Sequence, residues 1–210
     1  MTLYSYIVKE DGGFAPNPFF GYCTLACCKA PIRRKARKGD WIVGLTPKAK
    51  RNKVVYFMEV EETLTFKKYW RDARFKEKRP KFDAGTAAKH GDNIYKPSKK
   101  HSFGYRQLPS AHSEPMFGKS ENESKKERDL KSERVLVSTN FAYFGSNALD
   151  LPPELKALRV GRGNRSRSLD NVKTEFRHFV STQRKLGVLG RPADWTKDDG
   201  SWKGSACGKR

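Results

Sequence analysis

Short apolar runs separated by polar connections predict β-strands in the first part of the chain. Residues 3–9 (LYSYIVK) alternate rings with small or polar residues, which predicts the first strand. Residues 41–45 follow a Gly-Asp turn and predict a short buried strand. Residues 54–60 are almost continuously β-branched or aromatic and give the strongest strand prediction. Residues 135–144 have the same composition and predict a fourth strand.

Two segments have the apolar spacing of helices instead. Thr65 can cap a helix that ends near residue 75 and whose apolar side chains are Phe66, Tyr69 and Trp70. The second helix is expected to stop at Gly187, after apolar residues at i, i+4, i+7 and i+8: Val172, Phe176, Phe179 and Val180. Because the connections are interrupted, a regular βαβ alternation is excluded. The prediction is an α+β fold with short strands wrapped into a small barrel or a strongly curved sheet.

Polar stretches set the expected domain organisation. We predict one domain over residues 1–192 and an irregular tail over residues 193–210. A lysine-rich surface excursion is expected at about residues 96–130. Within and after it, residues 119–134 are so densely charged that they are predicted to be mobile, with residues 128–134 as a candidate turn of helix.

Charge points to the class of partner. The 210 residues contain 44 Lys and Arg against 23 Asp and Glu, a net charge of +21, which attracts polyanions. Nucleic acid is the first candidate, DNA rather than RNA, and a modified nucleotide is the related one. A membrane is not expected, because no apolar stretch approaches the roughly 20 residues that span a bilayer. The N-terminus lacks a signal-peptide pattern, which predicts a cytoplasmic protein.

Cysteine and histidine spacing argues against a metal site. The cysteines include no C-x-x-C pair, and the histidines are scattered without an H-x-x-x-H pair. We therefore expect no metal and no cofactor, and we interpret the clustered cysteines as reduced, partly buried side chains. The residues concerned are Cys23, Cys27, Cys28 and Cys207, and His90, His101, His112 and His178.

Known catalytic motifs are absent from the sequence. It has no G-x-S-x-G, H-E-x-x-H or P-loop pattern, and GRGNRS at residues 161–166 has Ser166 where a dinucleotide fingerprint has its third glycine. Arginines beside glycines suit phosphate contacts instead, because the guanidinium donates two hydrogen bonds at once. The predicted phosphate-binding residues are Arg33, Arg34, Arg37, Arg162, Asn164 and Arg165.

Polar and aromatic side chains occur together in HGDNIYKP and STNFAYFGSN. Amides and carboxylates can read the hydrogen-bonding edge of a base, and rings can stack on its face. The candidate edge readers are Asp92, Asn93 and Asn140, and the candidate stacking rings are Tyr95, Phe141 and Tyr143. Taken singly, each is more often structural than functional, and their co-occurrence favours a base site.

Four ordered motifs make the chain similar to a known family. Residues 3–44, GDNIYK, RDLKSERVLVSTNFAYFG and GRGNRS resemble the nucleotide modification associated domain family, second type. The resemblance implies a PUA-like curved β-barrel of about five to six short strands, related to the EVE, YTH, ASCH and SRA domains. It also implies a base pocket beside the first strand, formed by Phe14, Asn17, Tyr22 and Trp41 and closed by Asp92, Asn93 and Tyr95.

The leading hypothesis is a nucleic-acid-binding module that recognises a modified or flipped base. The alternative is an enzyme acting on a nucleotide or nucleobase, with Asp92 as general base and a cysteine of the 23–28 cluster, such as Cys23, as nucleophile. Its thiol would need Arg33 or Arg34 to lower its pKa. A third hypothesis is a basic accessory protein that binds RNA or a partner protein through the excursion alone. The sequence leaves the oligomeric state open.

Overall fold

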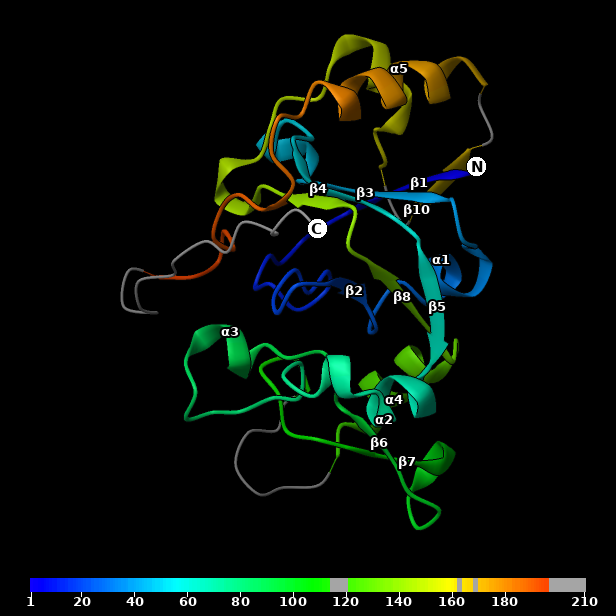
Figure 1. The fold of residues 1–210 in the computed structure, drawn as a ribbon, viewed down its shortest axis with the longest axis vertical. Coiled ribbons are helices and arrows are strands. Elements are labelled where there is room, and N and C mark those ends of the chain that lie inside the picture. Colours follow the sequence, from blue (N-terminus) through cyan, green and yellow to red (C-terminus); the bar gives the residue numbers. More distant parts are fainter. Residues whose placement is uncertain (114–120, 162–163, 168–169, 197–210) are drawn as a thin grey trace.

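A computed structural model describes residues 1–113, 121–161, 164–167 and 170–196 of the protein. The α+β class is confirmed, with three layers below a long helix (Figure 1). The uppermost layer is a six-stranded sheet in the order β10-β1-β3-β4-β9-β11. Its strands are β1 (Leu3–Ile7), β3 (Trp41–Leu45), β4 (Val54–Glu59), β9 (Phe141–Tyr143), β10 (Asn164–Arg167) and β11 (Gly187–Val188).

The six-stranded sheet is mixed and open within the described residues. β1 pairs with β3 in parallel, whereas β3 with β4 and β4 with β9 are antiparallel. β10 and β11 form its two edges and do not pair with each other, so no closed barrel is formed by the described strands. The predicted barrel is therefore replaced by an open sheet. The chain leaves this sheet twice to build a second one, after β1 for β2 and after β4 for β5 and β8.

The second sheet lies beneath the first, in the order β2-β8-β5. Its strands are β2 (Cys23–Leu25), β5 (Glu62–Thr65) and β8 (Arg134–Ser138). The strand predicted over residues 135–144 is therefore two strands, β8 and β9, in different sheets. Glu61 stabilises the turn between them, because its carboxylate accepts hydrogen bonds from the backbone N–H groups of Thr139 and Asn140.

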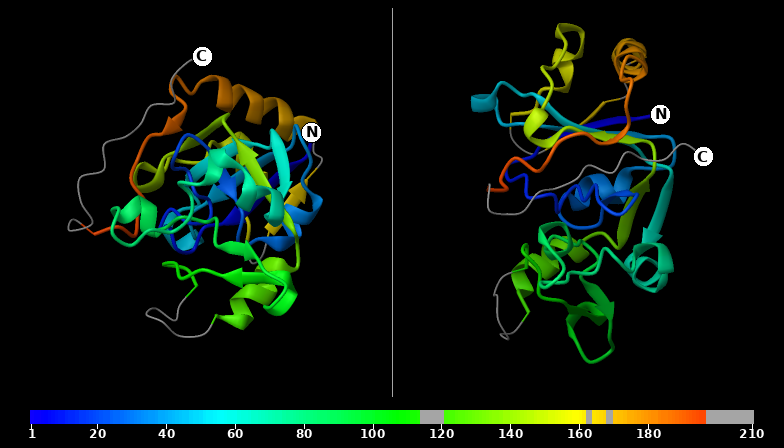
Figure 2. Two further views of the ribbon diagram at one scale, coloured as in Figure 1. Left: turned by 60° about the horizontal axis from the view of Figure 1, so that its bottom comes forward. Right: turned by 60° about the vertical axis from the view of Figure 1, so that its left-hand side comes forward.

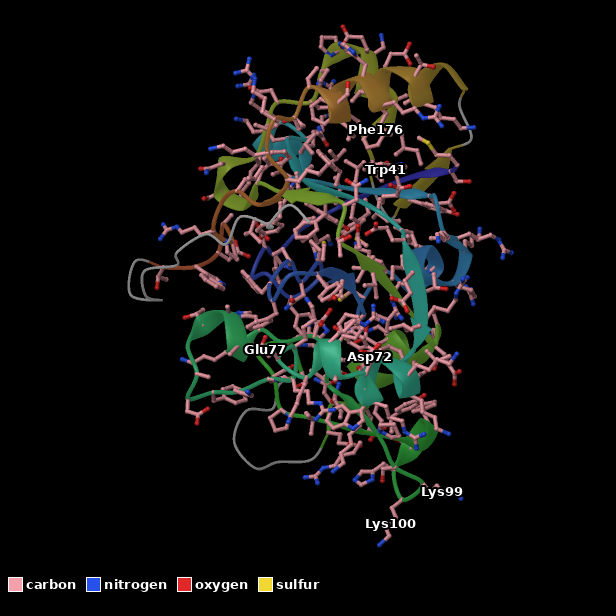
Figure 3. The ribbon with its side chains drawn as sticks, viewed as in Figure 1. Trp41, Asp72, Glu77, Lys99, Lys100 and Phe176 are labelled. Carbon is pink, nitrogen blue, oxygen red and sulfur yellow. The ribbon has the colours of Figure 1, made fainter. Side chains whose placement is uncertain are left out.

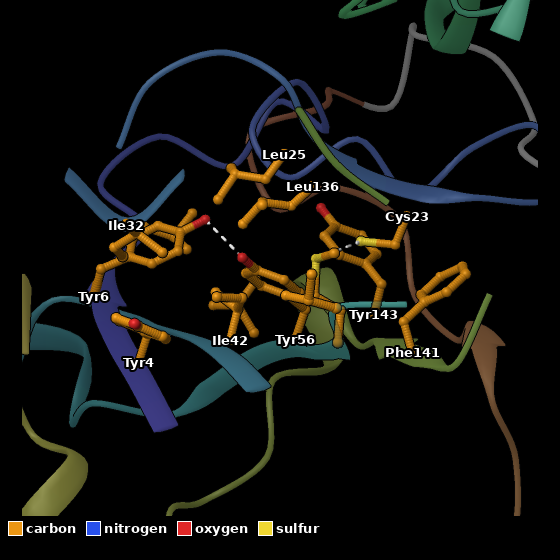
Figure 4. Close-up of a cluster of buried hydrophobic side chains, with 14 of the residues drawn as sticks. Tyr4, Tyr6, Cys23, Leu25, Ile32, Ile42, Tyr56, Leu136, Phe141 and Tyr143 are labelled. Carbon is orange, nitrogen blue, oxygen red and sulfur yellow. Dashed lines mark hydrogen bonds between the residues drawn. The ribbon is translucent and has the colours of Figure 1, made fainter. Parts of the chain in front are cut away.

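Apolar side chains fill the space between the two sheets (Figure 4). The cluster joins Tyr6 and Tyr56 of the upper sheet, whose hydroxyls lie 3.0 Å apart, to Leu136 of the lower sheet. Cys23 is fully buried in it, with Sγ 3.8 Å from Met58 Sδ.

The opposite face of the upper sheet is covered by α5 (Asp170–Ser181) and by the 3-10 helix η5 (Pro153–Leu158) (Figure 2). Strand alternation directs Trp41 and Val43 to this face and Ile42 to the other. Trp41 packs against Phe176 of α5, with ring centroids 5.4 Å apart (Figure 3). The helix predicted from residues 172–180 is thus confirmed, and its apolar stripe explains why it lies on this sheet. It ends at Ser181 and not at Gly187, which belongs to β11.

The lowest layer contains the short helices and a small hairpin. Thr65 caps α2 (Phe66–Arg71) as predicted, because its side chain accepts a hydrogen bond from the N–H of Lys68. The helix ends at Arg71, earlier than residue 75, and the 3-10 helix η2 (Ala73–Phe75) continues it. The other elements of this layer are α3 (Thr86–Lys89), β6 (Tyr95–Pro97), β7 (Tyr105–Gln107) and α4 (Glu123–Leu130). The helix α1 (Ala30–Lys35) lies beside β8 and α4.

The lysine-rich excursion is more ordered than the sequence predicts. Residues 96–130 include strand β7, most of strand β6 and the helix α4, whereas residues 114–120 lie outside the described part. Lys126 and Asp129 of α4 are buried, and Lys126 forms an ion pair with Glu121. The charge density of the sequence did not reveal this ordered helix, because the buried charged side chains of α4 have partners inside the fold.

Candidate functional site

A cleft of about 960 Å³ opens where the end of β1 approaches α1 and α4. Its walls are completed by the segment after β1, the turn before α1, residues 111 and 112, and the single residues His90 and Asp194. Its volume lies within the usual range of ligand pockets, which is about 300–1,000 Å³. The residues that line it are Tyr6, Ile7, Val8, Lys9, Glu10, Gly12, Phe14, Ala15, Cys28, Lys29, Ala30, Pro31, His90, Ala111, His112, Lys125, Arg128, Asp129, Lys131 and Asp194.

Basic side chains outnumber acidic ones on the walls. Five lysine or arginine residues face three carboxylates, those of Glu10, Asp129 and Asp194. Lys9 and Arg128 are exposed, so their charged ends are available to a ligand. Lys29 is different, because its Nζ already donates to the Ile7 carbonyl and lies 4.6 Å from the centre of the Tyr6 ring. The cleft therefore favours an anionic ligand.

Two rings stack on one wall of the cleft. Phe14 lies parallel to the His112 imidazole, with ring centroids 4.3 Å apart and an interplanar angle of 15°. Phe14 is the predicted base-pocket residue that the structure brings to the cleft, and His112 was not predicted. Flat rings on a basic wall are suited to a ligand with an aromatic base and phosphates.

A cluster of three chemically active side chains lies on the same wall. Cys28 Sγ is 3.8 Å from His112 Nε2, and His112 Nε2 is 3.7 Å from Asp129 Oδ2. The three candidate donor atoms all lie within 4.8 Å of one another. Cys28 and His112 are partly exposed, whereas Asp129 is buried. We call these residues the Cys28–His112–Asp129 cluster.

Hydrogen bonds hold the Asp129 carboxylate in place. Oδ1 accepts from the Cys28 N–H at 2.6 Å, and Oδ2 accepts from the Tyr95 hydroxyl at 2.9 Å. Burial favours the neutral acid, but His112 and the Cys28 N–H outweigh it and lower the pKa of Asp129. For His112, burial opposes the charged ring, but Asp129 and Cys28 raise its pKa to about 9. In the absence of a ligand, this wall therefore contains an imidazolium beside a carboxylate.

Arg33 lies behind the cluster and organises its backbone. The guanidinium is fully buried and donates to the carbonyls of Cys28 at 2.7 Å and Asp129 at 2.5 Å. It also donates to the carbonyls of Ser132 and Arg134, both at 2.7 Å. Arg33 was predicted to bind phosphate, but its donors are directed at the protein's own backbone.

The polar residues predicted to read a base form a buried structural network instead. Asn17 donates to the carbonyls of Gly13 and His90, and Asn93 donates to those of Tyr69 and Phe75. Asp92 is fully buried and accepts hydrogen bonds from the hydroxyls of Thr24 and Tyr69, both at 2.6 Å.

Burial argues against the catalytic roles considered for Asp92 and Cys23. Neither residue lines the cleft, and both are fully buried. Burial raises the pKa of the Cys23 thiol far above its usual value, although Lys78 acts in the opposite direction. A buried neutral thiol is a poor nucleophile. The cysteine in the cleft is Cys28.

The remaining predicted base-pocket residues lie elsewhere. Trp41 is on the far face of the upper sheet, against α5. Tyr22 packs on Phe75, with ring centroids 5.1 Å apart, and Asn140 donates to Glu59. The Tyr143 hydroxyl donates to Asp11 inside the core. Tyr95 is buried, and it contributes to the cleft through its hydrogen bond to Asp129.

Two of the remaining predicted phosphate ligands have described side chains, and neither lines the cleft. Arg34 and Arg37 are exposed near α1 but outside the cleft lining. Arg162 lies outside the described residues, as does Cys207. Asn164 and Arg165 belong to β10, and only their backbone is described.

Sequence reasoning missed His112, Asp129 and the basic residues of α4. Cys28, His112 and Asp129 are separated by 84 and 17 positions, so no local spacing links them. Charge density was the available signal, but it was interpreted as solvation. The α4 pattern, with Asp129 one turn after Lys125, could have indicated an ordered helix end.

The fold and the cleft define an α+β protein with a basic, ring-lined pocket and a thiol, an imidazole and a carboxylate on one wall. The chain belongs to the nucleotide modification associated domain 2 family, whose model matches residues 1–199. This membership connects the protein with nucleotide modification systems. No curated protein and no solved structure matches the chain significantly. Among the described helices, none is long and apolar enough to cross a bilayer.

Proposed function

We propose that the cleft binds a nucleotide unit, within a nucleic-acid strand or free, and that it prefers a modified or flipped base. The observation that carries this proposal is the basic cleft of about 960 Å³ with the Phe14–His112 ring stack on its wall. Basic side chains supply phosphate contacts, and rings supply stacking worth about 1–3 kcal/mol per base. The family's association with nucleotide modification favours a modified base.

The position of the cleft supports the relation to PUA-like domains that the sequence predicts. Those domains hold a base beside the first strand, and here the cleft opens beside the end of β1, at Tyr6 and Ile7. DNA is proposed as the polymer rather than RNA. The site differs from the sequence prediction in its residues, because the base faces Phe14 and His112 and not Trp41.

The phosphate part of the proposal is tested by a matched pair of double variants. Lys9→Ala with Arg128→Ala removes two exposed charges from the cleft. Lys99→Ala with Lys100→Ala removes two exposed charges at the far tip of the molecule (Figure 3). We expect only the first pair to weaken binding of short DNA duplexes strongly. The slope of log affinity against log salt should also fall by roughly two for that pair.

Base preference is tested by a second matched pair. Phe14→Leu removes a ring from the cleft, and Phe19→Leu makes the same change in the same loop, where Phe19 packs on Trp195 outside the cleft. Affinities are measured for DNA and RNA strands that carry one modified or one ordinary base. Phe14→Leu should reduce the preference among bases without changing the salt slope. The proposal would be contradicted if the two lysine and arginine double variants lost DNA affinity equally and the wild type showed no preference among bases.

A chemical step on the bound nucleotide is the second candidate function. The observation that favours it is the Cys28–His112–Asp129 cluster, which places a thiol and an imidazole on the cleft wall. Nucleosides recovered after incubation with the protein are examined by mass spectrometry. A mass change that disappears in Cys28→Ala, while DNA affinity is retained, would support this function over pure recognition.

A further inference from the structure

We propose that Cys28, His112 and Asp129 form a binding site for a divalent metal ion of the zinc class, with an open coordination position toward the cleft. Cys28 Sγ, His112 Nε2 and an Asp129 carboxylate oxygen are the three ligand atoms. They come from the turn before α1, from the segment after β7 and from α4. The sequence argued against a metal because these residues share no local spacing.

The distances resemble the edges of a coordination polyhedron more closely than hydrogen bonds. Tetrahedral bonds of about 2.3 Å to sulfur and about 2.0–2.1 Å to nitrogen and oxygen put S and N about 3.6 Å apart and N and O about 3.3 Å apart. The observed separations are 3.8 Å and 3.7 Å. A contraction of a few tenths of an ångström on these two edges would accommodate an ion. The third edge, from Sγ to the carboxylate oxygen, lies within 4.8 Å and would shorten by up to about 1.2 Å.

A hydrogen-bonded triad would have a different geometry. In such a triad the imidazole uses one nitrogen toward the thiol and the other toward the carboxylate. Here Sγ and Oδ2 both approach the same nitrogen, Nε2 of His112. The distance of 3.7 Å from Nε2 to Oδ2 also exceeds the range of an N–H···O hydrogen bond, which is about 2.7–3.2 Å. Three donor atoms that lie within 4.8 Å of one another, two of them close to the same nitrogen, therefore fit an ion between them.

The ligands are held in position by the surrounding protein. Tyr95 and the Cys28 N–H orient the two oxygens of Asp129. Lys125 Nζ donates to the His112 carbonyl at 2.5 Å, and buried Arg33 binds the carbonyls of Cys28 and Asp129. Outer contacts of this kind orient metal ligands and raise the affinity of a site. The charged groups of Lys125 and Arg33 are thereby bonded to carbonyl oxygens and not to the three ligand atoms.

The donor set selects the class of ion. Thiolate and imidazole favour zinc-class ions, whereas Mg²⁺ and Ca²⁺ prefer oxygen ligands alone. Three protein ligands leave a fourth tetrahedral position, as in zinc sites that bind water or substrate. All three residues line the cleft, so this position is accessible to its ligand. Only this last point rests on the proposed function, because it takes the ligand to be a nucleotide.

The experiment uses the 210-residue protein without an affinity tag, after bound metal has been removed with a chelator. Co²⁺ is titrated first, because thiolate ligation gives a near-ultraviolet charge-transfer band, and Zn²⁺ then competes for the site. We expect one ion per chain. Cys28→Ser should abolish the band and weaken Zn²⁺ binding at least 100-fold, and His112→Gln should weaken Zn²⁺ binding comparably. Cys207→Ser is the matched control, because it removes a cysteine outside the described residues.

Two results would overturn the metal site. One is no stoichiometric Co²⁺ or Zn²⁺ binding by the wild type. The other is a charge-transfer band that survives in Cys28→Ser or disappears in Cys207→Ser. Circular dichroism checks folding of each variant, and His112→Gln provides the test if Cys28→Ser does not fold. Nucleotide binding by the chelated protein is measured separately, so failure of the metal site is distinguishable from failure of the proposed function.

Discussion

The Tyr95 hydroxyl donates a hydrogen bond of 2.9 Å to Asp129 Oδ2. Tyr95 is buried beneath the cleft wall and Asp129 contributes to that wall, so the bond connects the core to the candidate metal site. The Gln107 amide donates to the same hydroxyl at 3.2 Å and fixes its orientation. Tyr95 is therefore a positioning residue for the carboxylate.

Tyr95→Phe removes this hydroxyl and keeps the ring. We expect Zn²⁺ affinity to fall about tenfold, the lower end of the effect seen when an outer-shell contact to a metal ligand is lost. Nucleotide affinity of the chelated protein should not change. Competition titration with Co²⁺ and Zn²⁺ measures the first quantity. Tyr56→Phe is the control, because it removes a buried hydroxyl that is paired with Tyr6, away from the cluster. An equal effect of both variants on Zn²⁺ would contradict the positioning role.

Arg33→Met should strongly destabilise the fold. The buried guanidinium makes four hydrogen bonds to carbonyls, and methionine would leave those acceptors without a partner. We expect the free energy of unfolding to fall by about 3 kcal/mol or more. Urea denaturation measures the loss. Exposed Arg34, the next residue, provides the control, because Arg34→Ala should change stability by less than about 0.5 kcal/mol.

Local patterns predicted the elements of the fold because their causes are local. Side-chain alternation identified β1, the Gly-Asp turn before an apolar run identified β3, and continuous β-branched and aromatic composition identified β4. The Thr65 cap identified the start of α2. The pairing of strands is a long-range property, so the open sheet was not predictable in this way. The break at Thr139 depends on the carboxylate of Glu61, which is distant in sequence.

The candidate site was harder to predict because its parts come from distant segments. Alternation predicts that Trp41 and Ile42 point to opposite faces of a strand, but not which face borders a cleft. The sequence therefore does not distinguish aromatic and polar residues that line a pocket from those that are buried in the core. Phe14 was identified through the family resemblance, which implies a base pocket beside the first strand, whereas Asp129 depends on where α4 packs.

Trp41→Ala tests this reassignment directly. Because Trp41 packs against Phe57 and Phe176 under α5, its truncation creates a cavity in the core. We expect the free energy of unfolding to fall by about 3–5 kcal/mol. At temperatures where the variant is folded, its base preference should match that of the wild type. If the variant lost its preference among bases but kept its stability, Trp41 would instead be a base-pocket residue. Thermal melting and strand-binding titrations provide the two measurements.

The cysteines should differ sharply in reactivity. Cys28 is partly exposed in the cleft, whereas Cys23 and Cys27 are fully buried, and burial raises the pKa of both buried thiols. Brief treatment of the chelated protein with iodoacetamide should therefore alkylate Cys28 well before the other two. Bound Zn²⁺ should protect Cys28. Peptide mass spectrometry measures each site, and modification of Cys23 or Cys27 at the rate of Cys28 would contradict the structure.

Lys78 should make stability depend on pH in the alkaline range. Its fully buried Nζ donates to the carbonyls of Asn17 and Tyr22 at 3.0 Å and 2.9 Å. Burial lowers the pKa of Lys78 from 10.5 to about 8, although Asp92 acts in the opposite direction. Between these values the unfolded state holds the proton and the folded state releases it. The free energy of unfolding contributed by Lys78 therefore rises as pH increases from about 8 to 10.5.

Lys78→Met lacks the titrating amine and isolates this effect. Its stability relative to the wild type is measured by urea denaturation across the same pH window. The difference should grow in favour of the wild type as pH rises, by up to about 1.4 kcal/mol per pH unit. Lys99→Met, at an exposed position, reports the effect of removing a lysine charge alone. If the Lys78→Met and wild-type curves run parallel across the window, the lowered pKa of Lys78 is wrong. If the two stability curves converge as pH rises, the pKa of Lys78 is higher in the folded protein than in the unfolded chain. The three hydrogen-bond acceptors of its amine, including Asn17 Oδ1, would then outweigh burial.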